Sequence, residues 1–322
     1  MVSREQVATA KSIHRRTGKT FYLATRLLPE RVRRGTYVLY GFFRVADEVV
    51  DGDETLSAAE QRAELERIRE GVLGDRTPEE PVLAAFADIK DEYGIPDSEV
   101  EVFLDAMESD IEQQTYETAA ELDEYMRGSA VSVGHMMVYL MDPERENADA
   151  ALPHAGALGR AFQLTNFIRD VREDIDDLDR VYVPMERLRS NGVTVDQLRN
   201  HESSKGLTTA LQSELSRAES LYREGVAGIK YLPRDCQFPV LLAAVLYAEH
   251  HRLIRRQGFD VLSERPSLSL PRKLYVTART SWRWWRNDDP EAVFDAVSAV
   301  PADRTGPPED EEREYEDGLA TL

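Results

Sequence analysis

The sequence QLTNFIRDVRED occupies residues 163–174 and is the most informative stretch of the chain. Apolar residues recur in it at steps of three and four, which predicts a helix. Asp170 and Asp174 are four positions apart, so a helix places both carboxylates on one face, within about 6 Å at their Cβ atoms. Gln163 and Asn166 share that face. A mostly apolar helix that keeps one polar stripe is costly unless the stripe lines a cavity.

A second stretch, RVADEVVD at residues 44–51, repeats this spacing with Asp47 and Asp51. Such like charges repel each other, and Mg²⁺ in proteins is typically held by one or two carboxylates together with substrate phosphates. With 60 acidic residues in 322, the spacing alone favours a solvated helix face over a metal site. The apolar flanks, with Arg44 and Arg169 beside the acids, favour two facing stripes that hold a diphosphate through metal ions.

The rest of the chain predicts helices almost throughout, because strand alternation is scarce and apolar residues recur at helical steps. The expected helices span residues 29–50, 57–74, 81–93, 97–116, 122–141, 144–174, 207–229, 239–256 and 271–285, with an irregular stretch at 180–184. We therefore expect a single all-α domain over residues 4–295. The acidic segment 302–322 is expected to be a disordered tail.

The composition excludes several classes of protein. A net charge of −20 disfavours nucleic-acid binding, and a single cysteine, Cys236, excludes a disulfide scaffold and suits a reducing compartment. No apolar run reaches a membrane span and no secretory signal is visible, so we expect a cytoplasmic location. Only six of the 40 basic residues are lysine. An acid-rich, lysine-poor chain suggests a high-salt cytoplasm, a hypothesis that greatest stability at low salt would contradict.

Several motifs together resemble those of the head-to-head prenyl synthases, the family of squalene, dehydrosqualene and phytoene synthases. The resemblance runs from about residue 12 to residue 285. It is carried by GKTF at 18–21 with LLP at 27–29, YGFFRVADEVVD at 40–51, Tyr125 with Ala130, Val133 and Gly134, and QLTNFIRDVRED at 163–174 followed by RVYVP at 180–184. The wording of the N-terminal motifs is most similar to phytoene synthases of salt-loving archaea.

The resemblance implies an isoprenoid-synthase-type helical bundle around a central cavity. Mg²⁺, with Mn²⁺ as an alternative, would bridge acidic residues to the substrate diphosphates. The implied metal ligands are Asp47, Glu48, Asp51, Asp170 and Asp174. The four aspartates and Tyr125 are the implied catalytic residues. The implied substrate-binding residues are Lys19, Thr20, Phe21, Tyr40, Arg44, Gln163, Asn166, Arg169, Tyr247 and Arg265.

The reaction implied by this resemblance is the joining of two geranylgeranyl diphosphates through a cyclopropyl diphosphate to phytoene, a step of carotenoid biosynthesis that needs no NADPH. A squalene or dehydrosqualene synthase that uses two farnesyl diphosphates is the alternative. A non-catalytic helical protein that binds lipid or acts as a scaffold is a more remote one. Prenyl diphosphates are the expected partners, and contact with a membrane surface or with carotenoid-pathway enzymes stays open.

Two further groups of residues have competing interpretations. Trp282, Trp284 and Trp285 are expected to pack in the core, with a membrane-facing cluster as the alternative. The six histidines lack the spacing of a metal site, so we expect them to be structural or exposed. Cys236 is expected to be a buried thiol.

Overall fold

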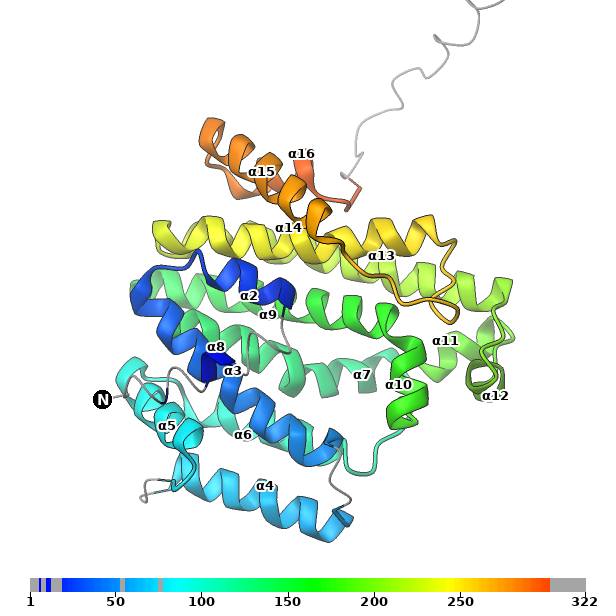
Figure 1. Cartoon of the computed structure of the whole chain (residues 1–322), viewed down its shortest axis with the longest axis horizontal. Helices are drawn as coiled ribbons and strands as arrows, with labels where there is room; N and C mark the ends of the chain where they lie inside the picture. The colour runs from blue at the N-terminus through cyan, green and yellow to red at the C-terminus, as the bar shows by residue number, and fades with distance from the viewer. Residues whose placement is uncertain (1–5, 7–9, 13–18, 53–55, 75–77, 302–322) are drawn as a thin grey trace, which may run out of the picture.

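The computed structural model describes residues 6, 10–12, 19–52, 56–74 and 78–301, and these form helices with no strand among them (Figure 1). The first half contains α2 (Lys19–Thr25), α3 (Glu30–Asp51), α4 (Ala58–Leu73), α5 (Pro81–Tyr93), α6 (Asp97–Ser109), α7 (Ala119–Met126), the π-helix η1 (Arg127–Val131) and α8 (Ser132–Met141). The predicted all-α class is confirmed.

The second half contains α9 (Arg145–Arg169), α10 (Val171–Leu178), α11 (Met185–Ser190), α12 (Val195–Arg199), α13 (Lys205–Ala227), the 3₁₀ helix η2 (Ile229–Tyr231), α14 (Arg234–Arg256), α15 (Leu270–Arg286) and α16 (Pro290–Val297). In Figure 1, α14 runs above α9, and α15 and α16 lie on the outer side of α14. The segment 302–322 lies outside the described residues, so the expected disorder there stays a prediction.

Local sequence signals set the helix ends that were predicted well. The hydroxyl of Ser57 accepts a hydrogen bond from the Glu60 backbone and the Glu60 carboxylate accepts one from the Ser57 backbone, which forms a capping box at the start of α4. Gly94 ends α5 in the left-handed region at φ 64°, a conformation that glycine adopts without strain.

Four predicted helices need correction. The helix expected over 144–174 breaks at Asp170, whose φ of −105° and ψ of 11° separate α9 from α10. Aspartate is a poor residue for a helix interior, and here Arg169 and Arg265 hold its carboxylate. The helix expected over 122–141 contains the π-helix η1, the one over 97–116 already ends at Ser109, and the one over 239–256 begins at Arg234.

The tryptophans were also predicted wrongly in part. Trp282 and Trp285 are exposed, because the buried face of α15 is formed by Val276 and Thr280. Trp284 is the one that packs inward, against the ring of Phe238.

Helix α9 is the central element, and it packs closely on η1, α8 and α13. A Cβ atom at Gly159 would lie 2.4 Å from the Ala130 carbonyl oxygen, and one at Gly134 would lie 2.5 Å from the Ala155 carbonyl oxygen. Only glycine permits so close an approach of the backbones at these two positions. The tight packing fixes one wall of the space between α9 and α3.

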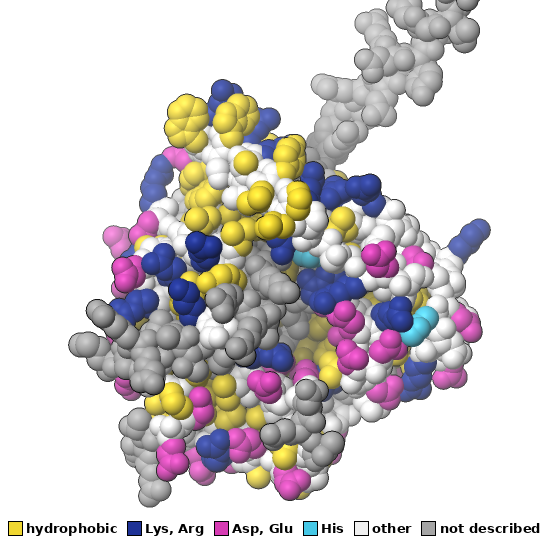
Figure 2. Space-filling model, viewed as in Figure 1, with side chains coloured by type: hydrophobic (Ala, Val, Ile, Leu, Met, Phe, Trp, Pro, Cys, Tyr) yellow, Lys and Arg dark blue, Asp and Glu magenta, His cyan; other side chains and the backbone are white. Residues whose placement is uncertain are grey.

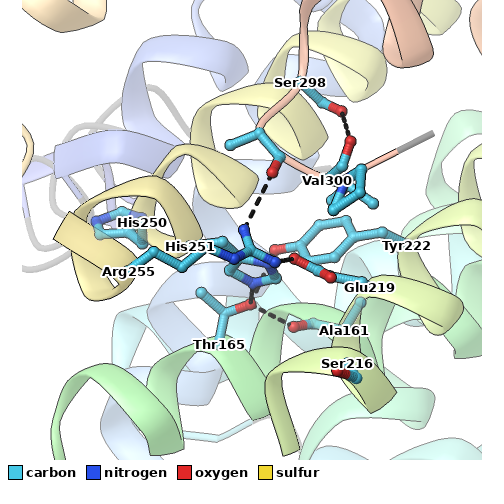
Figure 3. Close-up of polar contacts among 12 residues, drawn as sticks. Ala161, Thr165, Ser216, Glu219, Tyr222, His250, His251, Arg255, Ser298 and Val300 are labelled. Carbon is cyan, nitrogen blue, oxygen red and sulfur yellow. Dashed lines mark hydrogen bonds and ion pairs between the residues drawn. The ribbon is translucent and has the colours of Figure 1, made fainter. Parts of the chain in front are cut away.

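A buried polar network ties the far side of α9 to α13 and α14 (Figure 3). The His251 ring lies 2.9 Å from the Thr165 hydroxyl and 3.2 Å from the Glu219 carboxylate. Arg255 also pairs with Glu219 and donates a hydrogen bond to the Ala299 carbonyl oxygen. His251 is therefore structural, as predicted, and Cys236 is buried, also as predicted.

Candidate active site

A cavity of about 550 Å³ lies between α3, α8, α9 and α14. Along α3 its lining residues extend from Thr36 to Asp51, and along α9 from Ala151 to Asp170 at the end of the helix. At 1.5 Å per residue these stretches measure about 22 Å and about 28 Å, so the cavity is elongated. Its acidic residues are at one end, and small and apolar side chains line the remainder.

The first aspartate motif lies at the C-terminal end of α3. Arg44, one turn earlier, forms an ion pair with Asp47, and Nη1 of Arg180 lies 2.8 Å from Oδ1 of Asp51. The pKa of Asp47 is raised to about 6, because burial and the charge of Asp51 raise it more than the charge of Arg44 lowers it. The side chain of Asp47 keeps 34% of its surface exposed, so the carboxylate is half-buried at this end of the cavity.

The second motif lies where α9 gives way to α10. Nε of Arg169 donates a 2.6 Å hydrogen bond to Oδ1 of Asp170, and Nε of Arg265 lies 2.9 Å from the same oxygen. Burial raises the pKa of Asp174 to about 8, and the charge of Asp170 contributes to the rise. Desolvated acidic residues that face a cavity are typical of functional sites.

The guanidinium of Arg180 connects the two motifs. It pairs with Asp51, and its charge lowers the pKa of both Asp47 and Asp174, so the two acidic groups lie within the field of one side chain. Its Nη2 atom donates a 2.8 Å hydrogen bond to the Asp110 carbonyl oxygen. The motifs on α3 and α10 therefore converge at the same end of the cavity.

Arg180 and Asp110 are two residues of this site that sequence reasoning did not select. Arg180 is the first residue of the RVYVP motif at 180–184, so a sequence signal for it was present. Asp110 had none, because it is one of three acidic residues in the segment 110–118 between α6 and α7. An isolated parallel bridge between Thr115 and Val181 brings the two segments together.

Asp110 lies beside a cluster of aromatic residues at the cavity. The Tyr125 hydroxyl donates a 2.9 Å hydrogen bond to Oδ2 of Asp110, while Oδ1 is buried with no hydrogen-bond partner among the described residues. Burial raises the pKa of Asp110 to about 7 and the pKa of Tyr125 well above its ordinary value. The Tyr182 ring stacks on Tyr125 and, at 3.9 Å between centroids, on Phe167.

Most of the site residues predicted from the sequence line the cavity. Its lining includes Phe21, Tyr40, Arg44, Asp47, Asp51, Tyr125, Gln163, Asn166, Arg169, Asp170, Asp174 and Tyr247. Glu48 is exposed and does not line the cavity, because it occupies another face of α3 than Asp47. Arg265 lies outside and pairs with Asp170 and Glu173. The side chains of Lys19 and Thr20 lie outside the described residues.

The acidic end suits a divalent cation that is shared with a ligand. Among the described residues, no three acidic, histidine or cysteine side chains are grouped closely enough to hold a metal ion. Oδ1 of Asn166 is buried without a hydrogen-bond partner from the described residues, and it lines the cavity with Asp170 and Asp174. Such oxygen donors fit Mg²⁺, whose remaining positions are commonly filled by water and substrate phosphates.

Comparison with known proteins identifies the family. The family model described as squalene/phytoene synthase matches residues 14–272. The phytoene synthase of Thermus thermophilus is 34% identical over 256 residues, which is 77% of this chain and 83% of that protein. The phytoene synthase of Rhodobacter capsulatus is 29% identical over 285 residues, 87% of this chain and 82% of its relative.

Solved structures agree with this match. A dehydrosqualene synthase in complex with a ligand superimposes with a TM-score of 0.79 at 28% identity, over 88% of this chain and 98% of that one. The squalene synthase HpnC of Alicyclobacillus acidocaldarius gives a TM-score of 0.65 at 26% identity, over 80% and 95%. The fold and site therefore define an isoprenoid-synthase-type enzyme. The chain belongs to the squalene/phytoene synthase family, whose members are prenyltransferases.

Proposed function

We propose that this chain is a phytoene synthase, which joins two geranylgeranyl diphosphates through a cyclopropyl diphosphate. The observation that carries the proposal is the convergence of both aspartate motifs on Arg180 at one end of an elongated apolar cavity. That arrangement suits a molecule with a strongly charged head and a long apolar tail. Relatives named phytoene synthase at about 30% identity support the choice of substrate.

The acidic end would bind the diphosphates with the help of divalent cations. Five carboxylates, those of the two motifs and of Asp110, line this end together with Arg44 and Arg169, while Arg180 and Arg265 pair with Asp51 and Asp170 from beside it. A diphosphate would add more negative charge, so further cations are required for binding. Bound Mg²⁺ would neutralise the departing diphosphate, and Asp47, Asp51, Asn166, Asp170 and Asp174 are the residues that would hold it.

The cavity walls would protect the carbocation left when the diphosphate leaves with the bonding electron pair. Aromatic rings of Phe21, Phe162 and Tyr247 contact one another along the wall, with centroids 4.6 to 6.4 Å apart. Their faces stabilise positive charge, and the apolar lining excludes the water that would quench it.

Two protons must be lost for two geranylgeranyl chains to become phytoene, one at ring closure and one at the end. Tyr125 and Asp110 form a hydrogen-bonded pair within the cavity, and Oδ1 of Asp110 has no partner among the described residues. We infer that this pair takes up one of these protons. Since the last step is a proton loss and not a hydride transfer, the proposed reaction needs no NADPH.

A squalene or dehydrosqualene synthase that uses farnesyl diphosphate is the second candidate, because the structural relatives carry those names. Small residues such as Ala151, Gly225 and Ala243 leave the part of the cavity away from the aspartates open to a long tail. This favours the C20 substrate over the C15 one.

The domain bounds and the cellular location of the protein are also proposals. We propose a single catalytic domain over residues 4–295, located in the cytoplasm and in peripheral contact with a membrane. Carotenoid-pathway enzymes remain proposed partners. No helix among the described residues is both long and apolar enough to cross a bilayer.

Product analysis tests the proposed function. The purified chain, incubated with geranylgeranyl diphosphate and Mg²⁺ but without NADPH, should yield a C40 hydrocarbon identified by mass spectrometry, and a chelator should stop the reaction. A C30 product from farnesyl diphosphate, with none from the longer substrate, would assign the chain to the second candidate. Full activity without a divalent metal would refute the metal-dependent site.

Variants at each of the two motifs sharpen this experiment. Asp47→Ala or Asp170→Ala should lower turnover at least about 1000-fold while the helix content by circular dichroism stays unchanged. Glu48→Gln is the matched control, since Glu48 neighbours Asp47 in sequence but is exposed outside the cavity. It should retain turnover within about threefold. Equal losses in Asp47→Ala and Glu48→Gln would contradict the assignment.

A further inference from the structure

Helix α15 presents an exposed apolar face that no described part of the chain covers. Trp285 is 80% exposed and Leu270 is 68% exposed. The other large apolar side chains exposed on this helix are Leu274, Tyr275 and Trp282. The opposite face is anchored, because Val276 and Thr280 are buried against the rest of the fold. Figure 2 shows these hydrophobic side chains gathered at the top of the molecule, over α15.

The same helix differs from the rest of the chain in its charge. It carries five basic residues and no acidic residue, whereas the whole chain has a net charge of −20. Arg283 and Arg286 form no ion pair with the described residues, although acids are abundant in this chain. The Arg286 guanidinium lies 3.9 Å from the centroid of the Trp282 ring. This face of α15 therefore combines exposed tryptophans with arginines that form no ion pair among the described residues.

Amphipathic helices of this kind are suited to the interface of a lipid bilayer. Tryptophan and tyrosine rings are favoured at the depth of the lipid headgroups, where one end is apolar and the other is wet. Arginine side chains can extend to the headgroups from the same face. Basic residues beside an apolar face add attraction to anionic lipids.

We propose that the exposed face of α15 docks this protein onto an anionic lipid bilayer. The negative remainder of the molecule is repelled by such a surface, so the basic face sets a single orientation of binding. In that orientation α15 lies between the membrane and α14, which lines the cavity with Val240, Ala243 and Tyr247. The proposal rests on exposure and charge and does not depend on which prenyl diphosphate is used.

Co-sedimentation with vesicles tests the docking surface. The full chain should bind vesicles of phosphatidylcholine mixed with phosphatidylglycerol, and it should bind phosphatidylcholine vesicles at least about tenfold more weakly. Raising the salt concentration should weaken binding without abolishing it, because the apolar contribution is not screened. Trp282→Ser combined with Trp285→Ser should lower the affinity at least about tenfold. Equal binding by this variant and the wild type would overturn the proposal.

Reversing the charge of arginines on α15 is the second test of vesicle binding. Arg283→Glu with Arg286→Glu should weaken binding to the anionic vesicles by about 30-fold or more. Arg189→Glu with Arg199→Glu makes the same change of charge on α11 and α12 and should bind within about threefold of the wild type. Both variants should retain turnover with detergent-dispersed substrate. If both double variants lost binding equally, the loss would follow from the change in net charge of the protein and not from the α15 surface, which would contradict the proposal.

A measurement of self-association tests the alternative that a second copy of the chain, and not a membrane, covers this face. If Trp285→Ser abolished a dimer seen by analytical ultracentrifugation, and the wild type did not bind either vesicle, the face would belong to a second copy of the chain. Failure of vesicle binding by the wild type therefore overturns the lipid proposal on its own. It leaves the catalytic proposal untouched, because product formation is measured separately.

Discussion

At the scale of single residues, the site contains carboxylates that the fold keeps poorly solvated. Burial raises the pKa of Asp47, Asp110 and Asp174 to about 6, about 7 and about 8. A carboxyl whose pKa is higher in the folded protein than in the unfolded chain binds its proton more tightly when folded. Its contribution therefore favours folding at low pH and is lost as the pH rises towards the folded pKa.

This predicts that Asp174→Asn stabilises the protein without ligand. The amide carries no charge, so the variant avoids the cost of a buried carboxylate. At pH 8 we expect the melting temperature to rise by roughly 3–8 °C, with a smaller gain at pH 5, measured by differential scanning calorimetry. Turnover should be lost in the same variant, as expected where a functional site is kept at a cost in stability.

Asp176→Asn is the control for this prediction. Asp176 is exposed, and its hydrogen bond to His201 lowers its pKa, which is the opposite direction of shift. Its replacement should change the free energy of unfolding by no more than about 0.5 kcal/mol. If Asp174→Asn were less stable than the wild type at pH 8, the neighbouring positive charges would offset the cost of burying the Asp174 carboxylate, which would contradict the prediction.

At the scale of elements, helix α9 determines where the second motif lies. One of its faces lines the cavity through Gln163 and Asn166, and Thr165 on the other side enters the network with His251 and Glu219. The network fixes α9 against α13 and α14 within two turns of Asp170 (Figure 3). Burial lowers the pKa of the His251 ring, and its hydrogen bond to Glu219 acts in the opposite direction.

We predict that His251→Ala lowers the free energy of unfolding by about 2–4 kcal/mol. The change removes a fully buried side chain and leaves Thr165 and Glu219 with fewer partners. Urea denaturation followed by circular dichroism measures this loss. His201→Ala, which removes a partly exposed partner of Asp176, should cost less than about 1 kcal/mol. If both variants lowered the free energy of unfolding equally, the network around His251 would contribute no more to stability than an exposed contact.

Sequence patterns predicted helix identity better than helix boundaries. Capping residues such as Ser57 and the glycine at position 94 mark an end locally, and those ends were predicted correctly. The break at Asp170 was missed because a periodic apolar pattern continues across it. Ion pairs to Arg169 and to Arg265, which is far away in sequence, hold Asp170 in its non-helical conformation. No local signal reveals such a distant partner.

At the scale of the whole molecule, the cavity is a product of tertiary convergence. Motif spacing predicted Asp47, Asp51, Asp170 and Asp174, because those signals lie within short segments. It could not exclude Glu48, since the face that a helical residue presents depends on the packing of the helix. The role of Asp110 was equally hidden, because a loop brings it beside Arg180. The proposed high-salt habitat and the archaeal resemblance stay predictions.

The most direct test of the central claim is a crystal structure grown with Mn²⁺ and inorganic pyrophosphate, with the metal located by its anomalous scattering. We expect metal density at both motifs, that of Asp47 and Asp51 and that of Asp170 and Asp174, with the diphosphate at the same end of the cavity. Metal and diphosphate found elsewhere on the protein, or bound at only one motif with the other facing solvent, would contradict it.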